Sequence, residues 1–295
     1  MIPIRRAAFA LAAFSFFIGS LPAAEGVKIV LVAGQVKEVD KVGHHDYLGG
    51  CRLMQALLKQ TPGVDAVLVE KEWPTDESVF EGAAAVVFYT DGGGKQAYLA
   101  TPEHLALVQK LADGKTGLVN IHQAVEFPPE FAKQSADWTG GVYNAFSSRG
   151  HWDSVHDKFP EHPITRGVTP WKINDGWLNR FKFPAELKGI TPLVWSGKEA
   201  IGSPDGGDKD IVAWTFDRAS GGRSFNFSGL DAHHAWELDG MRKLVINGIL
   251  WSAGVEIPTD GAKCDADKAL VDSFLTPRIA PPPKKAKAKT ADSSK

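Results

Sequence analysis

The chain has 295 residues, of which 43% are hydrophobic and 23% charged, so it is long enough to bury a sizeable core. The first 24 residues carry two arginines and no acid, and the last 15 carry five lysines and one aspartate. The remainder has a net charge of about −8, which gives no basic face of the kind that binds nucleic acid.

Residues 1–24 have the pattern of a secretory signal peptide. Arg5 and Arg6 precede a short apolar stretch, AAFALAAFSFFIG, and the small residues of LPAA follow it. The stretch is too short for a spanning helix, and no other segment is apolar for long enough. We expect cleavage near Ala24 and an exported protein, periplasmic or secreted, with no transmembrane segment.

The first half of the chain alternates strand-like and helix-like segments. Leu53, Met54, Leu57 and Leu58 have helical spacing, and Thr101–Pro102 has the features of a helix start. We expect strands at Val27–Ala33, Ala66–Glu70, Ala84–Thr90 and Gly117–Ile121, and helices at Leu48–Lys59 and Thr101–Asp113. This rhythm predicts an α/β fold: a doubly wound, mainly parallel, flavodoxin-like sheet with helices on both faces.

The second half is expected to be an elaborated, loop-rich addition to that sheet. Residues 140–170 are rich in Gly, His, Asp and Ser and indicate mainly loop with short strands. Turn-forming residues at Ala219–Gly222 predict a hairpin between two of the later strands. We expect strands at Leu193–Trp195, Ile211–Phe216 and Ser224–Phe227, and a closing helix at Leu238–Trp251.

These patterns divide the chain into four parts. A signal peptide at 1–24 precedes an α/β domain at 25–258, a C-terminal extension at 259–280 and a tail at 281–295. The tail is rich in Pro and Lys and lacks large apolar residues, so we expect it to be disordered. The two cysteines, Cys51 and Cys264, either form a disulfide, which export permits, or are inert buried thiols.

Polar loops follow three of the predicted strands. Gly43–Tyr47 (GHHDY) follows the first, Asp91–Gly94 (DGGG) follows the third, and His122 follows Gly117–Ile121 directly. Ligands bind at the carboxyl ends of the strands in such a sheet, so the three loops should meet at one functional edge. Six of the nine histidines lie in loops beside Gly, Asp or Trp: His44, His45, His122, His151, His233 and His234.

His122 is the strongest single candidate for catalysis. A polar residue at a strand end, before a turn into a helix, projects into the crevice as the nucleophile of hydrolase-like sheets does. This turn has no Ser or Cys, which argues against covalent acyl chemistry, and His122 could instead only hydrogen-bond the neighbouring loops. The DGGG loop lacks the Lys and Ser/Thr of a P-loop, and no GxGxxG joins a strand to a helix, so we expect no nucleotide cofactor.

The histidines also raise the question of a metal ion. No pair has the spacing of a zincin helix or a zinc finger, so a divalent-metal site would have to be assembled from several loops. The chain also has nine tryptophans. Those in polar, Gly-rich surroundings either anchor loops or stack on a sugar ring. The combination with His, Asp and Asn favours a carbohydrate as the small-molecule partner.

Several longer blocks carry a resemblance to a known family. They are HDY, DGGG, GLVNIHQAVEFP, DWTGGVY, GHWDS, HPITRGV, VAWTFDRASGGRSFNFSGLDAHHAW and RKLVINGILWSAGVEIP. Together they resemble the ThuA-like family, the trehalose-utilisation type of protein, over most of residues 27–258. The resemblance implies a class I glutamine-amidotransferase-like fold without the usual Cys nucleophile, and a role in carbohydrate catabolism that involves 3-keto-sugars.

The resemblance implies a pocket that contains His45, Tyr47, His122, His151 and His233. Two positions depart from the family pattern. Relatives of this exported type often have an acidic residue where this chain has Gly176, before Trp177 and Leu178. They also tend to have a histidine where this chain has Asp231, which changes the softness of a metal ligand.

The sequence therefore predicts an exported carbohydrate-processing enzyme, a lyase, hydrolase or isomerase that uses histidine acid/base chemistry. A divalent metal ion is compatible with this chemistry. The alternative is a non-catalytic sugar-binding or scaffold domain on the same fold. The predicted catalytic residues are His122 and His45; the predicted substrate contacts are Tyr47, His151, Trp152, Trp177 and Trp236; and the predicted metal ligands are His45, Asp231 and His233.

Overall fold

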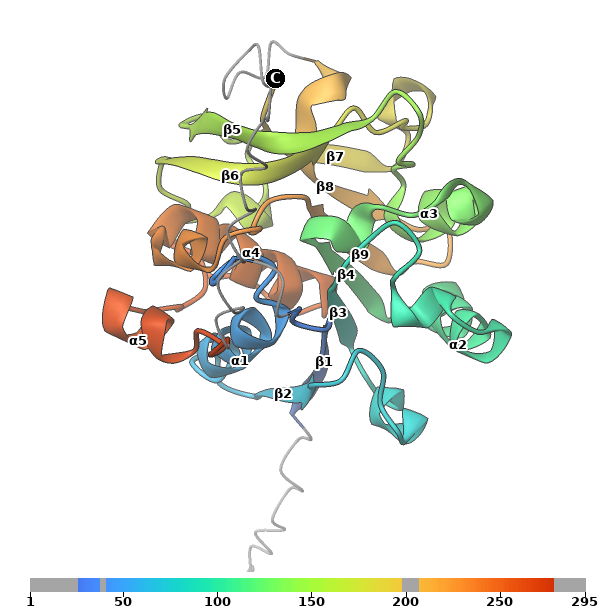
Figure 1. The fold of residues 1–295 in the computed structure, drawn as a ribbon, viewed down its shortest axis with the longest axis horizontal. Helices are drawn as coiled ribbons and strands as arrows, with labels where there is room; N and C mark the ends of the chain where they lie inside the picture. Colours follow the sequence, from blue (N-terminus) through green and yellow to red (C-terminus); the bar gives the residue numbers. More distant parts are fainter. Residues whose placement is uncertain (1–25, 38–40, 198–206, 279–295) are drawn as a thin grey trace, which may run out of the picture.

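The computed structural model describes residues 26–37, 41–197 and 207–278. Within these residues, seven strands form one sheet in the order β2-β1-β3-β4-β9-β8-β7, and β5 and β6 form a separate antiparallel pair (Figure 1). The strands are β1 (Val27–Ala33), β2 (Val64–Val69), β3 (Ala85–Tyr89), β4 (Gly117–Ile121), β5 (Ser148–His156), β6 (Trp171–Asn179), β7 (Ile190–Trp195), β8 (Ile211–Asp217) and β9 (Arg223–Phe227).

The sheet is mainly parallel, as predicted. Strands β2, β1, β3, β4 and β9 pair in parallel, and β8 and β7 extend the sheet antiparallel beyond β9. Alternate residues of β1 belong to different cores, with Ile29 and Leu31 on one face and Val30 and Val32 on the other. Both faces of the strand are therefore buried, which is the reason that its sequence is continuously apolar.

Helices cover both faces of the sheet, which confirms the doubly wound arrangement. The helices α1 (Tyr47–Leu58) and α4 (Asp239–Ser252) pack on the face of Ile29 and Leu31. The helices α2 (Pro102–Asp113) and α3 (Ala132–Thr139) lie on the opposite face. The side chain of Asp46 accepts the N–H of Gly49 at the start of α1, so the polar loop after β1 also caps a helix.

The second half of the chain is more regular than expected. Residues predicted as mainly loop contain the nine-residue strand β5, and β6 and α3 were not predicted. The long β5–β6 ribbon lies near β7 and β8 in Figure 1, away from β2. Buried positions of the two strands carry polar residues, among them Ser154, His156, Asp175 and Asn179, and these residues conceal the apolar alternation expected of a strand with one buried face.

The C-terminal extension adds a short helix, α5 (Lys268–Ser273), that the sequence pattern did not predict. Cys51 and Cys264 are both buried and free, and burial raises the pKa of each thiol. Across the described part of the chain, no helix has the length and apolarity needed to cross a membrane. The predicted signal peptide and the predicted disordered tail lie outside the described residues.

Candidate active site

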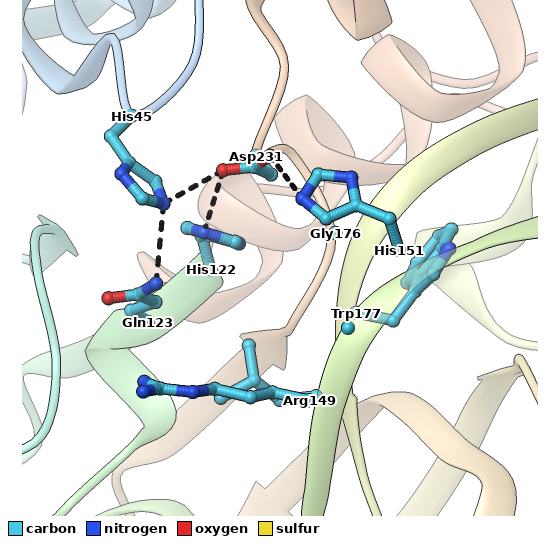
Figure 2. A pocket seen from close by; sticks show the side chains of 10 residues that line it. His45, His122, Gln123, Arg149, His151, Gly176, Trp177 and Asp231 are labelled. Atoms are coloured by element: carbon cyan, nitrogen blue, oxygen red, sulfur yellow. Dashed lines mark hydrogen bonds and ion pairs between the residues drawn. The ribbon is translucent and has the colours of Figure 1, made fainter. Parts of the chain in front are cut away.

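A cavity of about 310 Å³ opens at the carboxyl edge of the parallel strands. The loop after β1, the turn after β4 and the loop after β9 contribute to it, and the β5–β6 ribbon forms the remaining wall. Figure 2 shows these side chains converging from separate parts of the chain. The lining residues are His45, His122, Gln123, Arg149, Gly150, His151, Gly176, Trp177, Leu178 and Asp231.

Four histidines surround the carboxylate of Asp231, and three of them, His45, His122 and His151, line the cavity. Nε2 of His45 lies 2.9 Å and Nε2 of His122 lies 3.3 Å from Asp231 Oδ1. On the other oxygen, Oδ2, His44 Nδ1 lies at 2.8 Å and His151 Nε2 at 3.2 Å. Asp231 is only 2% exposed, so a buried negative charge lies at the centre of four imidazole rings.

This charge is electrostatically stabilised by its neighbours. Burial by itself raises the pKa of the Asp231 carboxyl, but the nearby imidazoles of His122 and His45 hold it well below its usual value. The carboxylate is therefore ionised throughout the pH range in which histidines titrate. A buried carboxylate that faces several imidazoles attracts either protons or a cation.

The turns that carry the site have strained backbone conformations. His45 has φ of +48°, His122 has +56° and Leu230, beside Asp231, has +69°. Residues other than glycine rarely adopt this left-handed backbone conformation, and those that do cluster at functional sites. His122 directly follows β4 and begins a short 3₁₀ helix, His122–Val125. It therefore occupies the sharp strand-to-helix turn that the sequence predicted, and its ring points into the cavity.

Asp175 holds the loop that carries Asp231. Its buried carboxylate accepts the backbone N–H groups of Leu230 at 2.7 Å, Gly176 at 2.9 Å and Ala232 at 3.2 Å. Burial raises the pKa of Asp175 to about 6, although nearby His122 and the backbone donors act in the opposite direction. Asp175 thus positions the site from β6 without lining the cavity.

The loops after β1 and β9 are joined to each other by backbone hydrogen bonds. His45 N–H donates to the carbonyl of Asp231 at 2.9 Å, and His233 N–H donates to the carbonyl of Gly43 at 2.6 Å. His44 and Ala232 also form an isolated antiparallel bridge. The two loops therefore hold their histidines and Asp231 in a single fixed arrangement.

His122 presents a ring nitrogen that a cation would satisfy. Its Nδ1 lies 3.2 Å from the carbonyl oxygen of Ser228, which can only accept, so Nδ1 carries the hydrogen. In the neutral ring, Nε2 then points a lone pair toward Asp231 Oδ1. This buried Nε2 makes no hydrogen bond within the described residues. An added proton or a metal ion between the two atoms would remove the repulsion.

The donor set also fits a divalent metal ion. Ligand atoms of His45, His122 and Asp231 lie close enough together to share one ion, and so do those of His44, His151 and Asp231. Two imidazoles and one carboxylate are ligands that Zn²⁺ and similar ions accept. The carbonyl of Ser228 would act as the outer hydrogen-bond partner that orients a histidine ligand.

The structure brings some of the predicted site residues together. His45, His122, His151, Trp177 and Asp231 all line the cavity. Trp177 is 1% exposed, so it supports the wall more than it offers a surface for stacking.

Other predicted site residues do not line this cavity. Tyr47 is buried and donates to Asp91 Oδ1 at 2.9 Å, and Trp152 donates to Ser196 Oγ at 2.9 Å inside the core. Trp236 packs in the same core. Tyr47 and Trp236 are fully buried, and Trp152 is 8% exposed.

The assignment of His233 as a metal ligand is not supported by the geometry. Its Nδ1 lies 3.1 Å from Asp46 Oδ2, and its Nε2 lies 2.9 Å from the carbonyl oxygen of Val271. Burial lowers the pKa of His233, but Asp46 and Val271 outweigh it and the net shift is upward. His233 thus lies at the junction between the loop after β1 and the C-terminal extension, and its Nδ1, like Nε2 of His122, makes no hydrogen bond within the described residues.

Comparisons with known proteins agree with this fold. The family described as trehalose utilisation, ThuA, matches residues 30–252. The chain belongs to the ThuA family. No curated protein matches it. One similar solved structure is a ThuA-like protein from Parabacteroides merdae, with 18% identity, a TM-score of 0.53, and coverage of 81% of this chain and 95% of that one.

A second solved structure is a ThuA-like protein from Bacteroides uniformis. It has 13% identity and a TM-score of 0.55, and the match covers 83% of this chain and 98% of that chain. At this level of identity, the two structures support the fold alone. This member of the ThuA family thus has a mainly parallel, flavodoxin-like sheet, as the sequence predicted.

Gly176 and Asp231 are neighbours in space. A Cβ atom added to Gly176 would lie 2.7 Å from Cβ of Asp231 and 3.0 Å from its carboxyl carbon. Asp231 therefore fills the space that a side chain at position 176 would need.

Sequence reasoning missed three residues of the site. His44 was noted as a histidine but received no role, although it contacts Asp231. Gln123 lines the cavity, with its Nε2 3.3 Å from Nε2 of His45. Arg149 also lines it and donates to both carboxylate oxygens of Glu126 at 3.0 Å. Their positions beside His45, His122 and His151 in the sequence were the signal available.

Proposed function

We propose that this chain is a carbohydrate-processing enzyme that acts on sugars or 3-keto-sugar derivatives in the cavity over Asp231. The observation that carries the proposal is the convergence of four histidines on one buried carboxylate at the carboxyl edge of the sheet. Family membership supports a sugar-related role. Lyase, hydrolase and isomerase chemistry all require proton exchange near a hydroxyl or a carbonyl, which such a cluster can support.

In this proposal His45, His122 and Asp231 hold a divalent metal ion. The buried, unsatisfied Nε2 of His122 and the fixed tautomer of its ring support this assignment. When bound, the ion would polarise a carbonyl or hydroxyl oxygen of the sugar. The two histidines predicted as catalytic would thus act as ligands, with their ring positions held by the strained turns.

The remaining wall of the cavity is suited to hold a polar substrate. Gln123 and Arg149 offer N–H donors, and Gln123 also offers a carbonyl acceptor, for sugar hydroxyls. Trp177 and Leu178 form the apolar part of the wall. A cavity of about 310 Å³ lies at the lower end of the size of small-molecule sites, so we expect it to bind one sugar unit.

The test is turnover of a panel of 3-keto-glycosides and the matching unoxidised glycosides, with and without added Zn²⁺ or Mn²⁺. We expect turnover with the metal, and a loss of at least about 100-fold in kcat/KM for His122→Ala, since outer-shell changes alone cost 10–100-fold. The matched control is His234→Ala, because His234 is exposed. Unchanged turnover in His122→Ala would contradict the proposal.

The same experiment tests the non-catalytic alternative. A purified chain that binds a sugar, measured by calorimetry, but turns over none of the panel would act as a binding or scaffold domain. The proposed cellular site is outside the cytoplasm, and the support is the signal-like sequence of residues 1–24. Mass spectrometry of the mature N-terminus would test this, with cleavage expected near Ala24.

A further inference from the structure

A second group of ligands lies on the far oxygen of Asp231. His44 Nδ1 and His151 Nε2 lie 2.8 Å and 3.2 Å from Oδ2. The proposed ion at His45 and His122 uses the other oxygen, Oδ1, at 2.9 Å and 3.3 Å. The two oxygens of one carboxylate thus each face two imidazoles, at nearly equal pairs of distances.

These separations suit a shared metal ion. Nitrogen and oxygen ligands lie about 2.0–2.2 Å from Zn²⁺, so neighbouring ligand atoms in a tetrahedral site lie roughly 3.3 Å apart. The ligand atoms of His44, His151 and Asp231 lie within 4.8 Å of one another. Two-ion enzyme sites hold their metals about 3.5–4 Å apart, a separation that one bridging carboxylate can span.

We propose that His44, His151 and Asp231 hold a second divalent ion, so that the cavity is a two-ion site bridged by Asp231. The inference rests on the proposed function, whose ion is held by His45, His122 and the same carboxylate. The second ion deepens that function because it selects substrates. Two adjacent ions favour a substrate with two neighbouring oxygens, such as the carbonyl and adjacent hydroxyl of a keto-sugar.

The second group is also held in place by the fold. His44 is part of the antiparallel bridge to Ala232, and Arg278 donates to its backbone carbonyl. His151 lies on β5 directly opposite Gly176 of β6. The side chain of His151 is 52% exposed, whereas that of His122 is 3% exposed. The second ion would therefore lie on the open side of the cavity, and the first on its floor.

The experiment uses the full chain, stripped with a chelator and titrated with Zn²⁺ alone. Elemental analysis and calorimetry should give two ions per wild-type chain. His44→Ala and His151→Ala should each give one, and Asp231→Ala should weaken both. Exposed His234 provides the control His234→Ala, which should keep two ions. With Mn²⁺ in place of Zn²⁺, the wild type should give the electron paramagnetic resonance spectrum of two spin-coupled ions. This measurement requires no variant.

The outcomes separate the two proposals. The second site would be overturned if the wild type bound one ion per chain and its Mn²⁺ spectrum showed no spin coupling. That single ion would be lost in His122→Ala but kept at equal affinity in His44→Ala and His151→Ala, and the proposed function would remain intact. No bound ion in the wild type would overturn both metal assignments, with the histidines then acting as hydrogen-bond donors to Asp231. If a variant fails to fold, His44→Gln and the wild-type Mn²⁺ spectrum decide the same question.

Discussion

The two edges of the parallel sheet use left-handed backbone in different ways. Where the chain enters β2, β3 and β9, the residues with positive φ are Gly63, Gly82 and Gly221. A Cβ atom added to any of these three would meet nothing within 4 Å. Glycine therefore serves only the turn at this edge, because it adopts the conformation without steric cost.

At the carboxyl edge, the same conformation occurs at Gly43, Gly93 and Gly94 and also at residues with side chains. His45, His122 and Leu230 have positive φ in the loops that follow β1, β4 and β9. Each such residue costs of order 1–3 kcal/mol, and the surrounding structure must over-determine it. A glycine would relieve the strain but would remove the imidazole, so strain is retained where the side chain is needed.

The largest effect that we expect is a loss of unfolding free energy at acidic pH, caused by a histidine in the β5–β6 ribbon that borders the carboxyl edge. Burial lowers the pKa of His156, at the end of β5, to about 3. An unfolded histidine titrates near 6.5, so below that pH the unfolded state binds the additional proton. The stabilising contribution is complete above about pH 6.5 and is lost as the pH falls, at about 1.4 kcal/mol per pH unit.

Urea denaturation at pH 7.5, 6.0 and 4.5 would measure this effect. His156→Gln should have a flatter dependence of unfolding free energy on pH than the wild type, and the exposed-site variant His234→Gln should follow the wild type. Parallel curves for all three proteins would show that the acid sensitivity arises elsewhere.

Gly176→Ala tests the close approach at the site. The new Cβ would clash with Asp231 at 2.7 Å, so the carboxylate must move away from the histidines. We expect Zn²⁺ affinity to fall roughly 10–100-fold, as it does when groups that orient metal ligands are changed. The control is Gly114→Ala before β4, where the nearest atom would lie at 3.4 Å. Equal affinity in both variants would refute the steric account.

Arg278→Ala tests whether the C-terminal extension holds the site loop. Arg278 donates to the carbonyls of Lys41, at 2.9 Å, and His44. The extension lies beyond the family match, which ends at residue 252. We expect Zn²⁺ affinity to fall about 10-fold, measured by calorimetry. Lys263→Ala in the same extension is the control, because its pair with Asp265 is exposed and loose at 3.7 Å; an equal loss there would argue against a specific role.

The smallest effect compares two replacements at His122. Both His122→Gly and His122→Ala remove the ring, but only glycine relieves the positive φ. His122→Gly should therefore be more stable than His122→Ala by about 1 kcal/mol, measured by chemical denaturation. At the opposite edge Gly63→Ala should lose about as much. If alanine were the more stable replacement at His122, backbone strain would not distinguish the two edges.

Sequence reasoning was most successful where the residue types of a segment indicate directly whether it is buried. The predicted strands Val27–Ala33 and Gly117–Ile121 match β1 and β4, since a strand buried on both faces is apolar throughout. It was less successful for β6, whose polar residues mask the pattern, and for α5. The apolar or polar nature of a segment is local information, but its partner in the fold is not.

The sequence by itself determined the parallel sheet, the family and the gathering of polar loops at one edge, because strand periodicity and the order of elements are local properties of the sequence. Only the tertiary structure decided which histidines share Asp231 and which, like His233, pair with Asp46 instead. The physical reason is that an imidazole can serve equally well as a ligand, a proton carrier or a hydrogen-bonding loop residue. Its role depends on which oxygen lies within about 3 Å, and residues nearly 200 positions apart supply that oxygen.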